Sequence, residues 1–92
     1  MKTIIDEIGK AAALEQLAEE ATELAQAALK YSRKLRGENP TPKTLKELEA
    51  DLTEEFTDVT VCAMCLKLCA DYEVMYSKMK RCQERIQNEQ KS

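Results

Sequence analysis

Apolar residues recur at steps of three and four along most of this chain, which is the spacing of helices that bury one face. The first amphipathic segment covers about residues 11–35. Its apolar positions are Leu14, Leu17, Ala21, Leu24, Ala28 and Tyr31. A short apolar stretch before it ends at Gly9, which predicts a break between a short N-terminal helix and one long helix.

A turn rich in proline and glycine separates this segment from a second amphipathic helix. Residues 37–42 hold both prolines and one of the two glycines, so the chain is expected to reverse there. Thr44 and Glu47 then predict a capping box for a helix over about residues 45–69. Its apolar positions are Leu48, Leu52, Val59, Cys62, Leu66 and Cys69. The alternation needs one more core residue, and Glu55 occupies that position.

A third amphipathic segment covers about residues 72–87, with Met75, Met79, Cys82 and Ile86 in its stripe. No glycine or proline separates it from the second helix, so the pattern alone also allows one continuous rod. Such a rod from Thr44 to the end would be roughly 70 Å long at 1.5 Å per residue, too long for a compact domain of this size. We therefore expect a turn at residues 70–73, with Asp71 as an N-cap and residues 88–92 as a frayed tail.

Composition makes this an all-α chain. It has 92 residues, with two glycines, two prolines, one phenylalanine and no tryptophan, whereas strong helix formers are abundant. This length predicts a single domain over residues 1–92, with a core at about 4–87. Because so short a chain buries only a modest core, a homo-oligomer is expected.

Charge and hydropathy exclude several classes of partner. A net charge of −3 argues against non-specific nucleic-acid binding, which needs a basic footprint. No apolar run approaches the roughly 20 residues of a membrane span, and acidic residues follow the first five positions, where a signal peptide would continue. The sequence therefore predicts a cytoplasmic protein without membrane or nucleic-acid partners.

The four cysteines fit a helical core. Cys62, Cys65 and Cys69 stand at i, i+3 and i+7, and Cys82 belongs to the next segment. This spacing favours small buried hydrophobes in a reducing compartment, and a zinc site or disulfides are the alternatives.

Two acidic pairs, each spaced i,i+3, lie in or beside the apolar stripes. Glu20 and Glu23 belong to the first helix, and Glu55 and Asp58 to the second. Burying a carboxylate costs several kcal/mol unless it is paired or binds a metal. If the two helices pack antiparallel, the four carboxylates meet and can bind a hard cation such as Mg²⁺. The alternatives are solvated acidic faces, or one buried acid beside a lysine or arginine.

The order of these acidic motifs resembles that of a known family. Glu19-Glu20-Ala21-Thr22-Glu23 and Glu55-Phe56-Thr57-Asp58 read as EExxE followed by ExxD, and Ser77-Lys78-Met79-Lys80-Arg81 and Glu84-Arg85-Ile86 follow. This ordered set is similar to the MazG-like all-α nucleoside triphosphate pyrophosphohydrolases. The resemblance covers about residues 4–86, with a spacer of 31 residues between Glu23 and Glu55 that is longer than usual.

The resemblance implies a fold, a reaction and residue roles. It implies an antiparallel four-helix-type bundle completed by a homodimer or homotetramer. The implied reaction hydrolyses nucleoside triphosphates to monophosphates and pyrophosphate, which cleans the nucleotide pool. Glu20, Glu23, Glu55 and Asp58 would coordinate Mg²⁺, with Mn²⁺ as an alternative ion. Glu19 would orient or deprotonate water, while Lys78 and Arg81 would hold substrate phosphates.

Several of these features also have non-catalytic or purely structural interpretations. The competing function is a non-catalytic helical interaction module, in which the stripes are coiled-coil seams and the acids fix the pairing register. Lys78 and Arg81 also suit a solvated basic face. The basic residues before Gly37 (Lys30, Arg33, Lys34 and Arg36) suit the C-terminus of a helix dipole. Phe56 is expected to pack in the core rather than to stack on a base.

Overall fold

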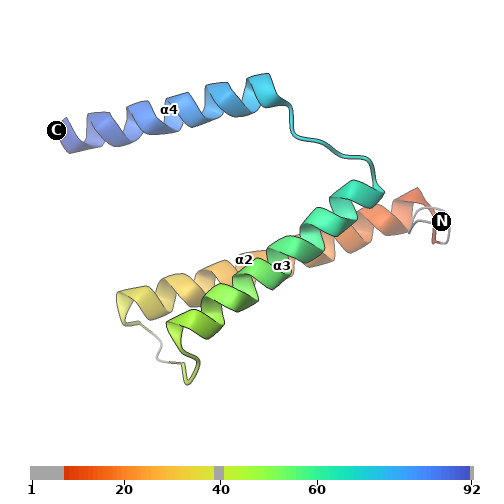
Figure 1. The fold of residues 1–92 in the computed structure, drawn as a ribbon, viewed down its shortest axis with the longest axis horizontal. Coiled ribbons are helices and arrows are strands. Elements are labelled where there is room, and N and C mark those ends of the chain that lie inside the picture. The colour runs from red at the N-terminus through yellow and green to blue at the C-terminus, as the bar shows by residue number, and fades with distance from the viewer. Residues whose placement is uncertain (1–7, 39–40, 92) are drawn as a thin grey trace.

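The described part of the chain, residues 8–38 and 41–91 of a computed structural model, is entirely helical (Figure 1). It contains helices α2 (Lys10–Arg36), α3 (Leu45–Cys65) and α4 (Tyr72–Lys91). The all-α prediction is thus confirmed within these residues. Gly9 precedes α2 with a positive φ of 82°, a conformation that suits glycine, which confirms the predicted break. The predicted N-terminal helix before Gly9 lies almost wholly outside the described residues.

Helices α2 and α3 form an antiparallel hairpin, and local sequence fixes both ends of its turn (Figure 1). Gly37 adopts the left-handed conformation with φ 73°, and its N–H donates to the Lys34 carbonyl, which ends α2. The predicted capping box begins α3. The Thr44 hydroxyl accepts from the Glu47 N–H at 3.1 Å, and the Glu47 carboxylate accepts from the Thr44 N–H at 3.0 Å.

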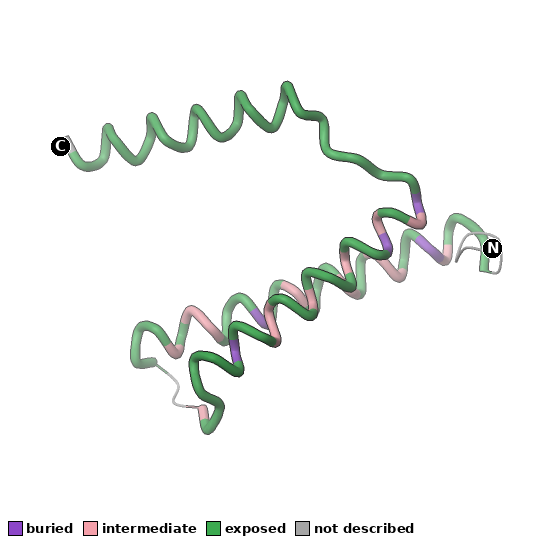
Figure 2. The backbone as a smooth tube through the Cα atoms, viewed as in Figure 1, coloured by how far each residue is buried: buried purple, intermediate pink, exposed green. Residues whose placement is uncertain are grey.

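The hairpin core is a thin seam between α2 and α3 (Figure 2). Its buried residues are Ala13, Ala27, Leu48, Cys62 and Leu66. The predicted α3 stripe is confirmed from Leu48 to Leu66. The predicted α2 stripe is confirmed at Leu17, Leu24 and Tyr31, which are partly buried. The prediction is wrong at Leu14, Ala21 and Ala28, which are exposed, because the seam uses Ala13 and Ala27 at the neighbouring positions. Alanines on several faces of α2 left these positions ambiguous in the sequence.

Phe56 is not a core residue, contrary to the prediction. Its side chain is 60% exposed on α3, one position from Glu55. Successive helix positions differ by about 100°, so a residue next to a seam position points away from the partner helix. The hairpin therefore exposes apolar side chains outside the seam.

Helix α3 ends earlier than its apolar pattern predicts. Lys67 has a left-handed φ of 59°, and its N–H donates to the Met64 carbonyl while the Leu68 N–H donates to Ala63. This is the hydrogen-bond pattern of a Schellman motif, here with lysine at the position that usually holds glycine. The predicted turn at residues 70–73 is thus too late, because no glycine marks the true helix end.

Replacing Lys67 by glycine is expected to stabilise the protein by about 1 kcal/mol, because a left-handed lysine carries a backbone cost that glycine avoids. In a continuous helix the same change would destabilise by about 1 kcal/mol. Urea unfolding followed by circular dichroism measures the sign. A loss of stability in Lys67→Gly would contradict the break after α3.

Helix α4 packs against neither α2 nor α3, and every described side chain on it is exposed (Figures 1 and 2). Its start agrees with the prediction, since the Asp71 carboxylate accepts from the Val74 N–H at 3.1 Å. The helix continues to Lys91, past the predicted end at residue 87 and through most of the predicted tail. Residues 8–38 and 41–91 of a single chain therefore do not form a four-helix bundle.

The dimensions of the chain agree with an incomplete core. Its radius of gyration is 17.1 Å, against about 12 Å for a compact domain of this length. Its accessible surface is 7779 Å², against about 5,400 Å² for a compact monomer of this mass. Among the helices of the described residues, none combines the length and hydrophobicity needed to cross a bilayer.

Candidate metal centre

Two glutamates occupy core positions in the seam between α2 and α3. Glu20 lies between Leu17 and Leu24 on α2, and Glu55 lies between Leu52 and Val59 on α3, all of them partly buried. One oxygen of each carboxylate, Oε2, is buried and has no hydrogen-bond partner. Buried polar atoms are rarely left unpaired, so two of them at adjacent places mark a candidate ligand site.

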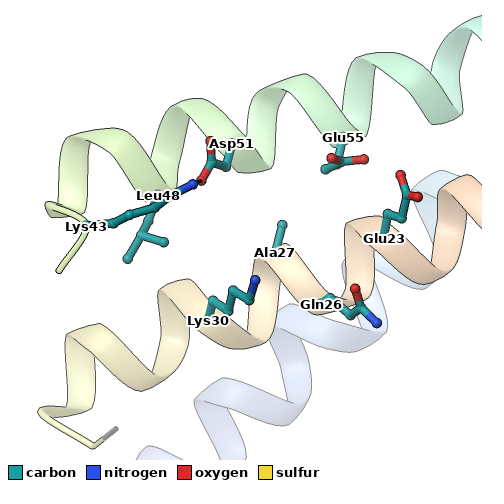
Figure 3. Close-up of a pocket in the computed structure, with 8 residues that line it drawn as sticks. All are labelled: Glu23, Gln26, Ala27, Lys30, Lys43, Leu48, Asp51 and Glu55. Atoms are coloured by element: carbon teal, nitrogen blue, oxygen red, sulfur yellow. Dashed lines mark hydrogen bonds and ion pairs between the residues drawn. The ribbon is translucent and has the colours of Figure 1, made fainter. Parts of the chain in front are cut away.

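Glu23 joins these two glutamates into a cluster of three carboxylates. Glu20, Glu23 and Glu55 each place one oxygen so that all three oxygens lie within 4.8 Å of one another. Figure 3 shows the Glu23 and Glu55 carboxylates pointing toward each other across the hairpin. Oxygens around one Mg²⁺ lie about 2.1 Å from the ion, hence at most about 4.2 Å apart. Small side-chain shifts would therefore close this cluster around a single ion.

The electrostatics of the cluster favour added positive charge. The pKa of Glu20 is raised, first by burial and then by the negative charges of Glu23 and Asp58. The pKa of Glu55 is also raised, first by burial and then by the negative charge of Glu23. Both shifts mean that nearby positive charges and hydrogen-bond donors do not balance the negative charges of the ionised carboxylates. A divalent cation or a proton relieves the same repulsion.

Two of the five predicted acids stand beside the cluster. Asp58 is exposed and is not one of the three converging carboxylates, but it lines a small cavity with Glu20 and Cys62. Its charge contributes to the raised pKa of both Glu20 and Glu55. Glu19 is also exposed, and its charge is the smallest of the contributions to the raised pKa of Glu20.

A cavity of about 400 Å³ adjoins the cluster along the hairpin (Figure 3). Glu23 and Glu55 line one end, and Lys30 of α2 and Lys43 from the turn line the other. Lys43 forms the ion pair of this cavity, with Nζ 2.6 Å from Oδ2 of Asp51. Its pKa is raised, first by the hydrogen bond to Asp51 and then by the charge of Asp51. The volume is within the range of small-molecule sites.

The predicted phosphate-binding residues are not brought to this cavity within one chain. Lys78 and Arg81 are exposed on α4, and α4 contacts neither helix of the hairpin. The two lysines at the cavity are Lys30 and Lys43, and the sequence reasoning explained Lys30 only by the helix dipole. The signal that was missed is the spacing of seven residues between Glu23 and Lys30, which places both on one face of α2.

The cysteines do not form a common site in the described residues. All four are free, with Cys62 buried, Cys65 partly buried, and Cys69 and Cys82 exposed. The core prediction is thus confirmed for Cys62 and wrong for Cys69 and Cys82. Burial raises the pKa of the Cys62 thiol, and the charge of Glu20 raises it further. A protonated thiol is a poor metal ligand, so the carboxylates are the better donors here.

Comparisons with known proteins give no match, whether the chain is set against protein-family models, curated proteins or solved structures.

Proposed function

We propose that this chain is a Mg²⁺-dependent nucleoside triphosphate pyrophosphohydrolase of the MazG-like type. The observation that carries the proposal is the convergence of Glu20, Glu23 and Glu55, with unpaired buried oxygens on Glu20 and Glu55. A set of carboxylate oxygens suits a hard ion, either Mg²⁺ or Mn²⁺. The ordered acidic motifs that resemble this family give the reaction class.

Each acidic residue has a distinct part in this proposal. Glu20, Glu23 and Glu55 would hold the ion, and Asp58 would join them from the rim after rotation of its side chain. When bound, the ion would polarise the α-phosphoryl group and lower the pKa of a water molecule. Glu19 would accept a hydrogen bond from that water and orient it toward the phosphorus. One oxygen each of Glu20 and Glu55 is buried in the seam, whereas Glu23 and Asp58 stand on its exposed side.

The proposed reaction is tested directly with purified protein and a panel of ribo- and deoxyribonucleoside triphosphates. We expect at least one nucleotide to give equal amounts of monophosphate and pyrophosphate with Mg²⁺, and none with excess chelator. Chromatography of the nucleotide and an enzyme-coupled pyrophosphate assay measure the two products. Folded protein that binds Mg²⁺ but releases pyrophosphate from no nucleotide would rule out this reaction.

We infer further that a second copy of the chain completes a four-helix unit. Helix α4 carries Val74, Met75, Met79 and Ile86 as exposed apolar side chains, from 40% to 57% accessible. The hairpin adds exposed Phe56, Val61 and Met64. Apolar surface of this extent is typical of an association site. In a cytosolic homodimer or homotetramer, Lys78 and Arg81 of one copy would then approach the site of another.

The oligomer is tested by light scattering coupled to size-exclusion chromatography. We expect a mass at least twice that of the chain. The double variant Met75→Glu, Met79→Glu should shift the mass toward the monomer, because it places two charges in the apolar stripe of α4. Lys80→Glu changes charge outside that stripe and is the control. A monomeric wild-type protein at micromolar concentration would contradict the completed bundle.

A non-catalytic interaction module is the second candidate function. The seam positions on both helices alternate strictly by four and three, as in a coiled coil, and α4 offers an unpartnered stripe. In such a module the seam glutamates would only fix the register in which the helices pair, and Mg²⁺ would not change the free energy of unfolding. The response to Mg²⁺ therefore separates the two candidates.

A further inference from the structure

We propose that Lys30 and Lys43 form a phosphate-chain subsite next to the carboxylate cluster. This inference rests on the proposed function, and it assigns contacts with the polyphosphate to residues outside the acidic and α4 motifs. The ligand class is a metal-bound polyphosphate, of which a nucleoside triphosphate is one example.

The cavity joins the two kinds of charge in one space. Glu23 and Glu55 line its end at the cluster, whereas Lys30 and Lys43 line the opposite end (Figure 3). Leu48, which lies beside the lysines, precedes Glu55 by seven residues on α3, or about 10 Å of helix at 1.5 Å per residue. This length suits a chain of two or three phosphoryl groups whose metal-binding end lies at the carboxylates.

The two ammonium groups reach this space from different elements. Lys30 projects from α2 with no ion-pair partner among the described residues, so its charge is available to a ligand. Lys43 approaches from the turn, and Asp51 holds its ammonium group at 2.6 Å. An ammonium group has three donors, so Lys43 keeps donors for a phosphate oxygen while Asp51 fixes its position.

Charge balance also requires cations at this end of the cavity. Glu20, Glu23, Asp51, Glu55 and the neighbouring Asp58 carry five negative charges around the cluster and the cavity. One divalent ion offsets two of them, and a polyanion would still be repelled. Lys30 and Lys43 offset two more without any contribution from α4. The hairpin itself therefore supplies cations for the phosphate chain, independently of Lys78 and Arg81.

The subsite is tested by titrating inorganic tripolyphosphate with Mg²⁺ into the full chain and measuring the dissociation constant by calorimetry. Tripolyphosphate has no base or sugar, so the measurement does not depend on nucleotide preference. We expect Lys30→Gln and Lys43→Gln each to weaken binding at least about tenfold, because each removes a charge-assisted hydrogen bond. Lys46→Gln, an exposed lysine of α3 outside the cavity, should change the constant less than twofold.

A variant that is expected to tighten binding serves as a control, because structural damage alone would not increase the affinity. Asp51→Asn removes a negative charge from the cavity but keeps an oxygen that can accept from Lys43, so tripolyphosphate should bind severalfold more tightly. Wild-type affinity in both lysine variants, or an equal loss in Lys46→Gln, would overturn the subsite and leave the proposed reaction standing. A wild-type protein that binds neither Mg²⁺ nor tripolyphosphate would overturn the proposed function together with the subsite.

Discussion

Replacing Glu55 by glutamine is expected to reduce Mg²⁺-dependent pyrophosphate release at least about 100-fold. Glu55 combines a core position on α3, an unpaired buried oxygen and a place among the converging carboxylates. Glutamine keeps the shape of the side chain but removes the charge that holds a divalent ion, and loss of one such preorganised group costs about 10²–10³ in rate. The turnover number at saturating Mg²⁺ and nucleotide measures the effect.

A matched control for this variant is available on the same helix. Glu49 is exposed on α3 and lies outside the cluster, so Glu49→Gln makes the same chemical change without touching the site. We expect it to retain wild-type turnover. Circular dichroism should show that both variants keep the helical content of the parent. Full activity in a folded Glu55→Gln protein would remove Glu55 from the catalytic site.

Mg²⁺ at 100 times its dissociation constant is expected to raise the melting temperature at pH 7.5 on the order of 10 °C. Binding at that concentration contributes about 2.7 kcal/mol, and about 1 kcal/mol shifts the melting temperature of so small a domain by roughly 4–8 °C. Calorimetric scans with Mg²⁺ and with chelator measure the difference. Glu55→Gln should lose most of this response.

The response to Mg²⁺ should shrink as the pH falls toward 5. Glu20 and Glu55 have pKa values raised above 4.5 in the folded protein, so their ionisation destabilises the metal-free fold as the pH rises through those pKa values. At lower pH, protons relieve the repulsion and compete with the ion. Glu47 acts in the opposite direction, because its lowered pKa gives stability that is lost only as the pH falls below 4.5. Calorimetric scans between pH 5 and 7.5 therefore report the contribution of Glu20 and Glu55 without that of Glu47.

Glu55→Leu provides the control that separates the two candidate functions. Leucine completes the apolar seam, so the metal-free protein should melt at a higher temperature than the wild type at pH 7.5. In a metal site the variant gains this stability and loses the response to Mg²⁺. A wild type that shows no response to Mg²⁺ at either pH, with Glu55→Leu still more stable, favours the interaction module.

The fold could be predicted from the sequence where one face alone carried the apolar residues. The α3 stripe and the Thr44 cap were predicted correctly, because leucines and a two-residue capping pattern have few alternatives. The α2 stripe was predicted correctly at Leu17, Leu24 and Tyr31 but not at its alanine positions, because the alanines of α2 are spread over several faces. The end of α3 was also missed, because Lys67 adopts a conformation that sequence patterns associate with glycine.

The candidate site could be predicted only in its acidic half. Glu20 and Glu55 interrupt apolar stripes, and Glu23 lies one turn from Glu20, so the convergence of these three follows from helix geometry. Lys30 shares one face of α2 with Glu23, so its spacing was a usable signal, whereas the position of Lys43 depends on how the turn folds back over the hairpin, which no local pattern encodes. Helix α4 contacts neither α2 nor α3, which its amphipathic pattern did not indicate, so the separation of Lys78 and Arg81 from the cluster was not predicted.

Diffraction from crystals grown with Mn²⁺, with data collected for its anomalous signal, tests the central claim most directly. Mn²⁺ occupies oxygen-rich Mg²⁺ sites and can be identified by its anomalous scattering. We expect a peak between the carboxylates of Glu20, Glu23 and Glu55, with the side chains of Glu20 and Glu55 turned toward it. Crystals in which these carboxylates bind no ion, and instead pair with lysine or arginine side chains, would contradict the metal site.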